Sequence, residues 1–393
     1  MKDFDNTRTG PLHDVRVIDM SRLVAGNMLS VYLADFGADV IKVERPHTGD
    51  DLRHWRENGH DIYWKVYGRN KRSMVLDLKT DDGIDDFKAL VATAQVLIEN
   101  FVPGGLEKMG LSPETLLAIN PALLVVRVSG WGQTGPYREK PGFGTLVEAM
   151  SGFAHLNGFA DKPPALPPLA LADMIAGVYG AAGVLTALRV AEKTGQGQVI
   201  DLSLFEPIFS VISSEAAKFQ ATGTVSMRAG NHSSHTAPRN LYRCKDDYYI
   251  SMSGSMQAMA MQILEAIGRP ELKQDPRFID NDARVKNRAA LDEIIAGFVG
   301  ARTQAQNLAI FEKAGVTAGP VYSVAELIDH PYVVGREAIV NLPDDTLGQV
   351  PMHNIIPRLS QTPGQFRRPA PKLGEHTTEI LNEMGRAPKT SPQ

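Results

Sequence analysis

The chain is poor in cysteine and in clustered charge. Its single cysteine, Cys244, excludes a disulfide within the chain. A lone cysteine fits a reducing compartment, and we interpret Cys244 as a buried small residue. Acids and bases are mixed along the chain, with a formal net charge of -4 at pH 7, so the electropositive field that attracts nucleic acid or anionic lipid is missing. We therefore expect no nucleic-acid partner and no membrane partner.

Long apolar runs are also missing. The N-terminal sequence MKDFDNTRTG is polar, so we expect it to be neither a signal peptide nor a membrane anchor. No run approaches the roughly 18 apolar residues that a membrane span requires. Repeats and low-complexity tracts are likewise absent from the sequence. These absences make the cytoplasm the expected location.

The sequence does contain enough apolar material for two cores. Its 393 residues exceed the ~250–300 at which a single core stops growing. An apolar content of 43% and a charged content of 22% are typical of a globular protein. Changes in composition predict a large domain at residues 1–224, a smaller α+β domain at 225–330, and a C-terminal segment at 331–393 that returns to the large domain.

The first half of the chain alternates between strand and helix periodicities. Strand patterns cover 15–19, 38–44, 73–78, 95–101 and 123–130, and helical patterns cover 24–37, 82–94, 112–119 and 173–193. Strands separated by helices predict a parallel sheet with right-handed crossovers and helices on both faces. The expected fold class of the large domain is therefore α/β and Rossmann-like.

The region beyond residue 225 has a different pattern. The stretch LYRCKDDYYISMSG predicts a pair of strands with Asp246 and Asp247 at the turn. Helical patterns follow at 256–267, 285–299 and 303–314, and the tail PAPKLGEHTTEILNEMG carries one more. This region is the predicted α+β domain.

An open parallel sheet binds its ligand beyond the carboxyl ends of the strands, which are here the loops 20–26, 44–50 and 99–105. Glu44 ends the second strand and invites a dinucleotide interpretation, in which it holds a ribose. The first loop, however, has the single glycine Gly26 where the dinucleotide fingerprint requires three, so this interpretation is disfavoured. Basic residues that would suit phosphates lie near these loops: Arg45, residues 69–72, Lys79 and Lys108.

Six motifs follow one another along nearly the whole chain: ADFGADVIKVERPHTGDDLR, RNKRSMVLDLKTDDG, LIENFVPGGLEKMGL, VRVSGWGQTGPYREKPGFG, TGQGQVIDLSLFE and PKLGEHTTEIL. With them the chain resembles the family III CoA-transferases, the group of formyl-CoA transferase and carnitine CoA-transferase. The resemblance implies CoA transfer from an acyl-CoA to a small carboxylic acid, with no permanently bound cofactor and no metal. It also implies an interlocked ring homodimer.

The resemblance further implies which residues form the site. Asp173 matches the aspartate that forms covalent acyl and CoA intermediates in that family. The CoA-contacting positions match Leu23, Val24, Ala25, Arg45, Leu76, Lys79, Asn100, Phe101, Val102, Lys108 and Met109. These residues fall on the strand-end loops identified above.

Asp173 also has a purely structural interpretation. It follows a proline-rich approach and precedes a run of small and apolar residues, where aspartate is a favoured helix N-cap. A helix N-terminus favours the ionised carboxylate by roughly 0.3–1 kcal/mol, so the cap position also suits a nucleophile. Backbone amides near the helix start, with Gly177 allowing close approach, are expected to stabilise the oxyanions of the reaction.

The chain departs from the family at three places. Val24 replaces a glutamine of formyl-CoA transferase, and Gly144 replaces an acid that many members carry after the aromatic residue of PGF. The link GNHSSHTAPRN has one glycine where formyl-CoA transferase has a tetraglycine lid, which leaves the link's function as a lid open. Formyl-CoA and oxalate are therefore disfavoured, and short or medium acids, including dicarboxylates with succinyl-CoA as donor, are expected. His232 and His235 in the link are candidates for binding an acceptor carboxylate.

Two alternatives stay open. An α-methylacyl-CoA racemase carries a histidine–aspartate pair after GQTGP, because proton exchange at two faces requires a second base. This chain has GFGTLV at 142–147, which favours transfer over racemisation. A CoA-binding protein without activity would keep the loops and lose the nucleophile, whereas Asp173 is present.

Overall fold

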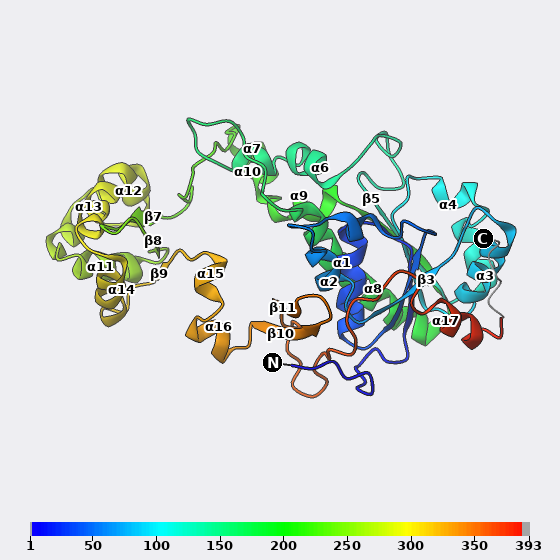
Figure 1. The fold of residues 1–393 in the computed structure, drawn as a ribbon. Helices are drawn as coiled ribbons and strands as arrows, with labels where there is room; N and C mark the ends of the chain where they lie inside the picture. The colour runs from blue at the N-terminus through cyan, green and yellow to red at the C-terminus, as the bar shows by residue number, and fades with distance from the viewer. Residues whose placement is uncertain (1, 387–393) are drawn as a thin grey trace. The chain divides into compact units, whose positions relative to one another are not determined.

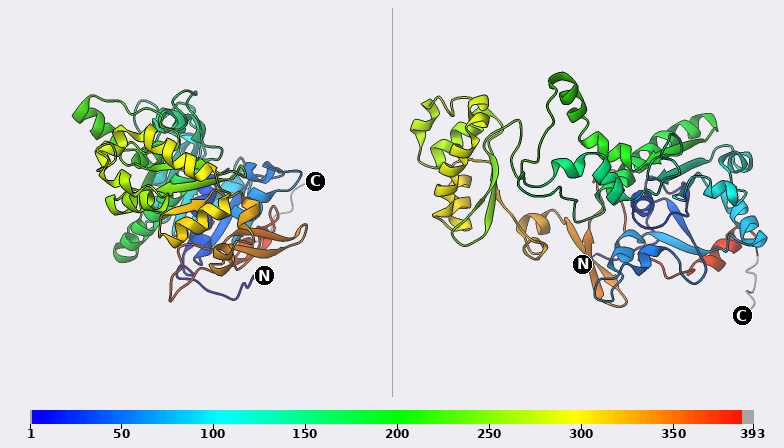
Figure 2. Two further views of the ribbon diagram at one scale, coloured as in Figure 1. Left: turned by 90° about the vertical axis from the view of Figure 1, so that its left-hand side faces the viewer. Right: turned by 90° about the horizontal axis from the view of Figure 1, so that it is seen from above.

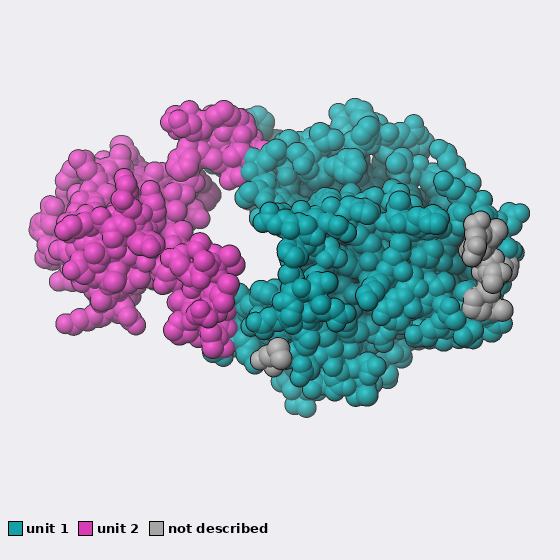
Figure 3. All heavy atoms as spheres, viewed as in Figure 1, with its two compact units in different colours: residues 1–153, 166–221, 335–393 teal, residues 154–165, 222–334 magenta. Residues whose placement is uncertain are grey.

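The structure, a computed structural model, describes residues 2–386. Contacts between residues divide the chain into two compact units (Figure 3). Unit 1 is made of residues 1–153, 166–221 and 335–393, and unit 2 of residues 154–165 and 222–334. Residues 154–165, which the sequence analysis assigned to the large domain, therefore group with the smaller unit.

A six-stranded parallel sheet forms the centre of unit 1, with its strands in the order β3-β2-β1-β4-β5-β6 (Figure 1). This order is that of a Rossmann fold, which confirms the predicted α/β class. The bounds are β1 (Arg16–Asp19), β2 (Asp39–Glu44), β3 (Lys71–Val75), β4 (Val96–Glu99), β5 (Leu124–Ser129) and β6 (Gln198–Ser203).

Helices cover both faces of this sheet. Successive side chains of a strand point to opposite faces, and in the central strands apolar side chains lie on both faces, so each face requires a cover. Ile98 and Val126 face a core formed with α1 and α8, whereas Leu97 and Val125 face a second core formed with α3, α5 and α17. The bounds are α1 (Ala25–Asp35), α3 (Asp81–Val91), α5 (Pro113–Ile119), α8 (Leu171–Thr194) and α17 (Thr377–Glu383).

Small residues let α8 pack closely against α1. A Cβ on Gly177 would lie 2.6 Å from the side chain of Met28, and one on Gly180 would lie 2.5 Å from Leu29 Cδ1. The face of Gly177 is thus occupied by α1, which is the close approach that this glycine allows. Stabilisation of the oxyanions by backbone amides near the helix start stays a prediction.

The expectation that the chain has no long apolar segment is wrong for α8. By length and composition alone, α8 passes the test for a membrane span, with a mean hydropathy of 1.6. Its buried face, which includes Ala176, Val184 and Leu188, packs against α1 and the sheet. A core helix of a globular unit passes this test as well, because it is also long and rich in apolar residues.

The last part of unit 1 contains a hairpin that the sequence analysis missed. Strands β10 (Ile339–Asp344) and β11 (Gly348–His353) pair antiparallel (Figure 2). Each strand contains a proline, Pro343 or Pro351, and proline weakens a strand pattern. Leu342 and Val350 of the hairpin form a small core with Phe366.

Unit 2 is an α+β unit built on the antiparallel sheet β7-β8-β9. Cys244 is buried in its core, as predicted, and Asp247 lies at the turn between β7 and β8 with a φ of 66°. The bounds are β7 (Arg239–Arg243), β8 (Tyr249–Ser253), β9 (Ala318–Pro320), α11 (Gln257–Ala266), α12 (Asn281–Lys286), α13 (Arg288–Gly300) and α14 (Gln304–Lys313).

Candidate active site

Asp173 lies in the first turn of α8, as its third residue. Its predicted role as the N-cap is wrong, because the cap position is Ala170, which makes no side-chain cap hydrogen bond. The helix starts earlier than expected, directly after the extended proline-rich segment. Asp173 nevertheless remains in the first turn, where the helix dipole favours a negative charge.

The carboxylate of Asp173 lies between two other elements of unit 1. A Cβ on Gly144, the first residue of α6 (Gly144–Met150), would lie 2.2 Å from Asp173 Oδ2. Glycine at this position therefore leaves the room that the carboxylate occupies. The backbone N–H of Ala25, at the start of α1, also hydrogen-bonds to the carboxylate.

This environment raises the pKa of Asp173 from 3.8 to about 6. Burial is the largest cause, and the negative charge of Glu148 adds to it. Hydrogen bonds from the backbone N–H groups of Asp173 and Ala25 act in the opposite direction and are outweighed. A carboxylate with this pKa is mostly ionised at pH 7 and more basic than an ordinary aspartate, which suits a nucleophile.

Glu148 is the acidic neighbour that the sequence analysis missed. It lies on α6, one helical turn after Gly144, and its side chain is almost fully buried. Its Oε1 accepts a hydrogen bond of 3.0 Å from the backbone N–H of Ala172, the residue before Asp173. Glu148 therefore holds the first turn of α8 while its charge acts on Asp173.

A cavity of about 650 Å³ lies beyond the carboxyl ends of β1 to β4, where the sequence analysis expected a ligand. We call it the strand-end cavity. It is lined by Met20, Ser21, Arg22, Val43, Glu44, Arg45, Pro46, His47, Thr48, Gly49, Asp50, Leu76, Asp77, Leu78, Lys79, Phe101 and Met109.

The structure brings some of the predicted CoA-contacting residues to this cavity and leaves others outside its lining. Those that line it are Arg45, Leu76, Lys79, Phe101 and Met109; those outside are Leu23, Val24, Ala25, Asn100, Val102 and Lys108. Asn100 fixes loop 20–26 through two hydrogen bonds to the backbone of Arg22. Val24 is buried with Leu52 and Trp64, and Val102 is 71% exposed.

Loop 20–26 connects the strand-end cavity to Asp173. Its first residues, Met20 to Arg22, line the cavity, and its Ala25 contacts the carboxylate of Asp173. A substrate whose reactive end follows this loop would therefore reach the carboxylate.

A fully buried cluster of charged side chains supports this loop from below. Lys42 Nζ lies 3.1 Å from Asp19 Oδ1, 2.8 Å from Asp50 Oδ2 and 2.5 Å from the backbone oxygen of Ser21. The second lysine, Lys71, reaches Asp19 Oδ2 at 3.4 Å. All four charged side chains are almost inaccessible to solvent. Two lysines and two aspartates balance each other, which is how buried charges are tolerated.

The buried cluster also fixes pKa values and backbone. Burial acts to raise the pKa of Asp50, but Lys42 and hydrogen bonds hold it down at about 2. Asp50 Oδ1 accepts from the backbone N–H of Leu23 at 2.9 Å, which helps hold Leu23 at its positive φ of 64°. Burial is the main cause that lowers the pKa of Lys71 to about 8.

One prediction about the cavity mouth needs correction. Residues 69–72 do not form a basic patch there: Arg69 pairs with Asp35, Lys71 belongs to the buried cluster, and Arg72 pairs with Asp39. The dinucleotide interpretation of Glu44, which the sequence already disfavoured, is also not supported, because its carboxylate is engaged by Arg53, Ser73 and the backbone of Asp50.

Arg22 is a cavity residue that the sequence analysis missed. It lies 5.9 Å from the ring centroid of Phe101, and its buried Nε has no hydrogen-bond partner among the described residues. The only feature of the sequence that could have pointed to Arg22 as a cavity residue is its position in a strand-end loop, 20–26. Arg22, Arg45 and Lys79 are the cations that line the strand-end cavity.

The histidines of the link lie in unit 2. His232 Nε2 lies 2.7 Å from Asp292 Oδ2 and 2.9 Å from Asn240 Nδ2, while the hydroxyl of Tyr242 donates to Asp292 Oδ1. The negative charge of Asp292 beside His232 disfavours an acceptor carboxylate at this ring. His235 is exposed.

No group of three or more histidine, cysteine or acidic side chains in residues 2–386 is arranged to hold a metal ion. The fold and the site define the class: a Rossmann-like α/β protein with a half-buried carboxylate beside a strand-end cavity of ligand size. Comparison with known proteins gives the family. The model of CoA-transferase family III matches residues 12–377, so the chain belongs to this family and is a CoA-transferase.

The chain is similar to proteins of known activity over its whole length. It is 40% identical to the succinyl-CoA–D-citramalate CoA-transferase of Chloroflexus aurantiacus, over 95% of this chain and 94% of that protein. It is 34% identical to the succinate–glutarate CoA-transferase of Agrobacterium fabrum, over all of both chains. A CaiB/BaiF family protein from Brucella suis matches with a TM-score of 0.85 at 34% identity, over 96% of this chain and 100% of that chain. The predicted family, fold class and enzyme class are thus confirmed.

Proposed function

We propose that the enzyme transfers CoA from succinyl-CoA to a second small carboxylic acid, with Asp173 as the covalent nucleophile. The observation that carries this proposal is the carboxylate of Asp173, half-buried, activated by burial and Glu148, and held by the loop that lines the strand-end cavity. The donor is inferred from similar proteins, one of which uses succinyl-CoA with D-citramalate and another succinate with glutarate.

In the proposed first half-reaction, an oxygen of Asp173 attacks the thioester carbonyl of the donor, and CoA leaves as the thiolate. The mixed anhydride that forms has two carbonyls. The thiolate attacks the carbonyl that belongs to Asp173, so succinate leaves and an aspartyl-CoA thioester remains.

The second half-reaction repeats these steps in reverse. The acceptor carboxylate attacks the aspartyl-CoA carbonyl and releases the thiolate, which gives a second mixed anhydride. The thiolate then attacks the acceptor's carbonyl, which releases the new acyl-CoA and the free carboxylate of Asp173. No step consumes water. The anhydride and thioester intermediates would hydrolyse if water reached them, so the partial burial of the carboxylate protects them.

The CoA ester is placed in the strand-end cavity in this proposal. Arg22, Arg45 and Lys79 would neutralise its phosphates, and the acyl end would follow loop 20–26 to Asp173. Asp51 pairs with Arg45 at 2.8 Å and with Arg22 at 3.6 Å, so a phosphate that contacts either guanidinium competes with Asp51. The Nε of Arg22 has no partner to exchange among the described residues.

The experiment that tests this function is a matrix of acyl-CoA donors against free acids, with mass spectrometry of the thioesters formed. We expect succinyl-CoA to be a good donor, dicarboxylic and hydroxydicarboxylic acids to be good acceptors, and formyl-CoA and oxalate to be poor substrates. Transfer restricted to monocarboxylic acids would contradict the dicarboxylate assignment while leaving CoA transfer intact.

A racemase function is the second candidate. It requires a base on the other face of the substrate α-carbon. The charge that acts on the pKa of Asp173 is that of Glu148, which already accepts a hydrogen bond from Ala172, and GFGTLV stands in place of the racemase histidine. We therefore expect no α-deuteration of a chiral α-methylacyl-CoA in heavy water; exchange near the turnover rate would restore the racemase interpretation.

We also propose that the enzyme acts as an interlocked homodimer. The helix α10 (Ser214–Thr222) buries none of its residues, and Tyr179 and Phe219 expose half of their surface. Large apolar side chains exposed on helices, here Phe219 of α10 and Tyr179 of α8, are typical of interfaces. We expect sedimentation to give one dimeric species at every concentration, because interlocked chains separate only on unfolding. A concentration-dependent monomer would contradict interlocking.

A further inference from the structure

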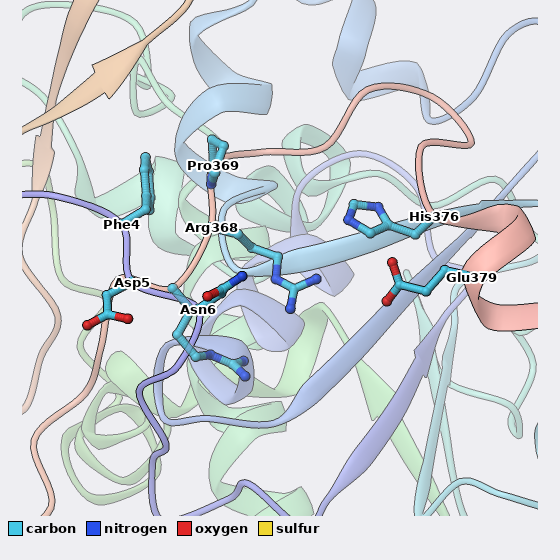
Figure 4. Close-up of a pocket in the computed structure, with 8 residues that line it drawn as sticks. Phe4, Asp5, Asn6, Arg368, Pro369, His376 and Glu379 are labelled. Atoms are coloured by element: carbon cyan, nitrogen blue, oxygen red, sulfur yellow. The ribbon is translucent and has the colours of Figure 1, made fainter. Parts of the chain in front are cut away.

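Unit 1 contains a second cavity, of about 540 Å³, that the proposed function does not use (Figure 4). We call it the arginine cavity. It shares no lining residue with the strand-end cavity. Arg367 of the arginine cavity donates to the backbone oxygen of Ala38, directly before β2, so this cavity lies toward the amino end of β2 and not at the carboxyl edge. It is lined by Phe4, Asp5, Asn6, Arg367, Arg368, Pro369, His376 and Glu379.

Two adjacent guanidinium groups in this cavity lack a carboxylate partner. Arg367 Nη2 donates to the backbone oxygens of Ala34 at 3.2 Å and Ala38 at 2.6 Å, and its buried Nε has no partner. For Arg368, no side-chain hydrogen bond or ion pair occurs among residues 2–386. Burial lowers the pKa of both arginines, and nearby arginines lower it further.

The acidic groups around the pair are already engaged. Asp39 is bonded to Arg16 and Arg72, and Glu379 is bonded to Arg72 at 2.8 Å. Asp35 is bonded to Arg69, and Glu375 accepts from the backbone N–H of Lys372. Asp5, on the other rim, accepts from Thr7 and Arg8. The charges of Asp35, Asp39, Glu375 and Glu379 act on the two arginines, but none of these carboxylates is paired with either guanidinium.

The backbone that carries the two arginines is fixed. Asn70 Oδ1 accepts from the backbone N–H groups of Arg367 and Arg368, and the backbone N–H of Asn70 donates to the oxygen of Arg368. Asn70 is itself buried and donates to Asp35. Figure 4 shows the guanidinium of Arg368 directed into the cavity between Asn6 and Glu379. A preorganised pair of this kind loses little freedom when it binds.

We infer that the arginine cavity binds a small oxyanion, a carboxylate or a phosphate group, at the paired guanidiniums of Arg367 and Arg368. Planar guanidinium groups recognise such oxygens with two parallel N–H donors. The buried Nε of Arg367 and the unpaired fork of Arg368 are the donors that the anion would satisfy. This site is separate from Asp173 and does not depend on the proposed transfer reaction.

The test is calorimetric titration of the full-length protein with inorganic phosphate and, separately, with succinate, in the presence of saturating free CoA. In the proposed function CoA occupies the strand-end cavity, so neither anion should bind there. Succinate bound beside Asp173 would be recognised as binding that Arg368→Ala leaves unchanged. We expect at least one of the two anions to bind, and Arg368→Ala to weaken its binding about 10- to 100-fold, as loss of a charge-assisted hydrogen bond predicts. The affinity of Arg368→Lys for the anion should fall between those of the wild type and Arg368→Ala, because lysine keeps the positive charge but lacks the two parallel N–H donors of the guanidinium.

Arg189→Ala is the matched control, because Arg189 is an exposed arginine of α8 in the same unit, and its removal should leave the binding unchanged. The comparison of the two probes distinguishes a dicarboxylate site from a phosphate site. The proposal would be overturned if, for both anions, the CoA-saturated wild type showed no binding that Arg368→Ala weakens. Circular dichroism of each variant checks that the fold is retained.

Discussion

Loop 20–26 meets two kinds of buried carboxylate. At its start, the N–H groups of Ser21 and Leu23 donate to Asp19 and Asp50, which are paired with buried lysines. At its end, the N–H of Ala25 bonds to Asp173, on which the acting charge is that of another carboxylate, Glu148. The two regions lie on one loop and have opposite electrostatics.

The pKa values express this difference. Burial acts to raise the pKa of Asp19, Asp50 and Asp173, but lysines hold those of Asp19 and Asp50 below the ordinary value. For Asp173 no positive charge counters burial, the two backbone hydrogen bonds are outweighed, and its pKa rises to about 6. A paired carboxylate is inert and holds the backbone, whereas an uncompensated one is available for chemistry. The comparison teaches that the partner, and not burial alone, separates structure from function.

The largest expected effect comes from removing the reactive carboxylate. Asp173→Asn keeps the shape of the side chain and removes the nucleophile, so we expect CoA transfer to fall by about 10³-fold or more. CoA-ester binding, measured by calorimetry, should be retained. A variant that transfers CoA at a comparable rate would return Asp173 to a structural role.

The same variant should be more stable than the wild type at neutral pH. The folded-state pKa of Asp173 is raised, so the stability that its protonated form provides is complete at about pH 4 and is lost as the pH rises to about 6. The loss amounts to about 2–3 kcal/mol, at about 1.4 kcal/mol per pKa unit. In urea unfolding, the free energy of unfolding of Asp173→Asn should exceed that of the wild type by this amount at pH 8 and should approach the wild-type value near pH 4.

The second prediction breaks the paired region instead. Lys42→Met leaves Asp19 and Asp50 buried with only Lys71 to compensate them, and should cost about 3–5 kcal/mol of stability. Lys193→Met, an exposed lysine of α8, is the control and should be nearly neutral. Equal urea midpoints for the two variants would show that the buried cluster does not hold the loop.

The third prediction moves the reactive carboxylate without removing it. A Cβ at position 144 would lie 2.2 Å from Asp173 Oδ2, so Gly144→Ala must displace the carboxylate. A displacement of about 1 Å lowers kcat by about 10²-fold. Gly183→Ala, on α8 where a Cβ meets nothing closer than 4.0 Å, should keep normal turnover. Normal turnover in Gly144→Ala would place the reacting carboxylate elsewhere.

The smallest effect is expected from Glu148→Gln. The substitution retains the oxygen that accepts from Ala172 and removes the charge that raises the pKa of Asp173. The acid limb of the kcat/KM profile, which the wild type should show near pH 6, should move to lower pH, with the plateau changed by less than about tenfold. Glu139→Gln, an exposed acid, should leave the profile in place. A profile unmoved by Glu148→Gln would mean that its charge does not act on the nucleophile.

Local patterns predicted most of the sheet and its helices. Strands β1 to β5 and helices α1, α3 and α5 fall within a few residues of their expected ranges, because the strands are almost entirely buried and the helices bury a regular set of apolar residues. The hairpin β10-β11 was missed, since its prolines weaken the strand pattern.

The electrostatics of the site were less predictable. The sequence analysis did not single out Asp19 or Lys42, which are charges in otherwise apolar strands. Their pairing depends on the register of β1 with β2, which no local pattern reports. The approach of Glu148 on α6 to Asp173 on α8 likewise depends on tertiary packing, which no local pattern reports. The raised pKa of Asp173 follows from that meeting and from burial, so a favourable helix terminus was the wrong guide to its charge.

The central claim, that the carboxylate of Asp173 takes part covalently, is tested most directly with an acceptor acid labelled with heavy oxygen in its carboxylate. In the proposed sequence the bridging oxygen of the second anhydride comes from the acceptor and stays on Asp173 when the thiolate releases the product. After turnover with succinyl-CoA, mass spectrometry should show heavy oxygen on Asp173 in the peptide spanning residues 168–188, and none on Glu148 in the separate peptide that contains it. A fully active enzyme whose Asp173 carries no label would contradict the account.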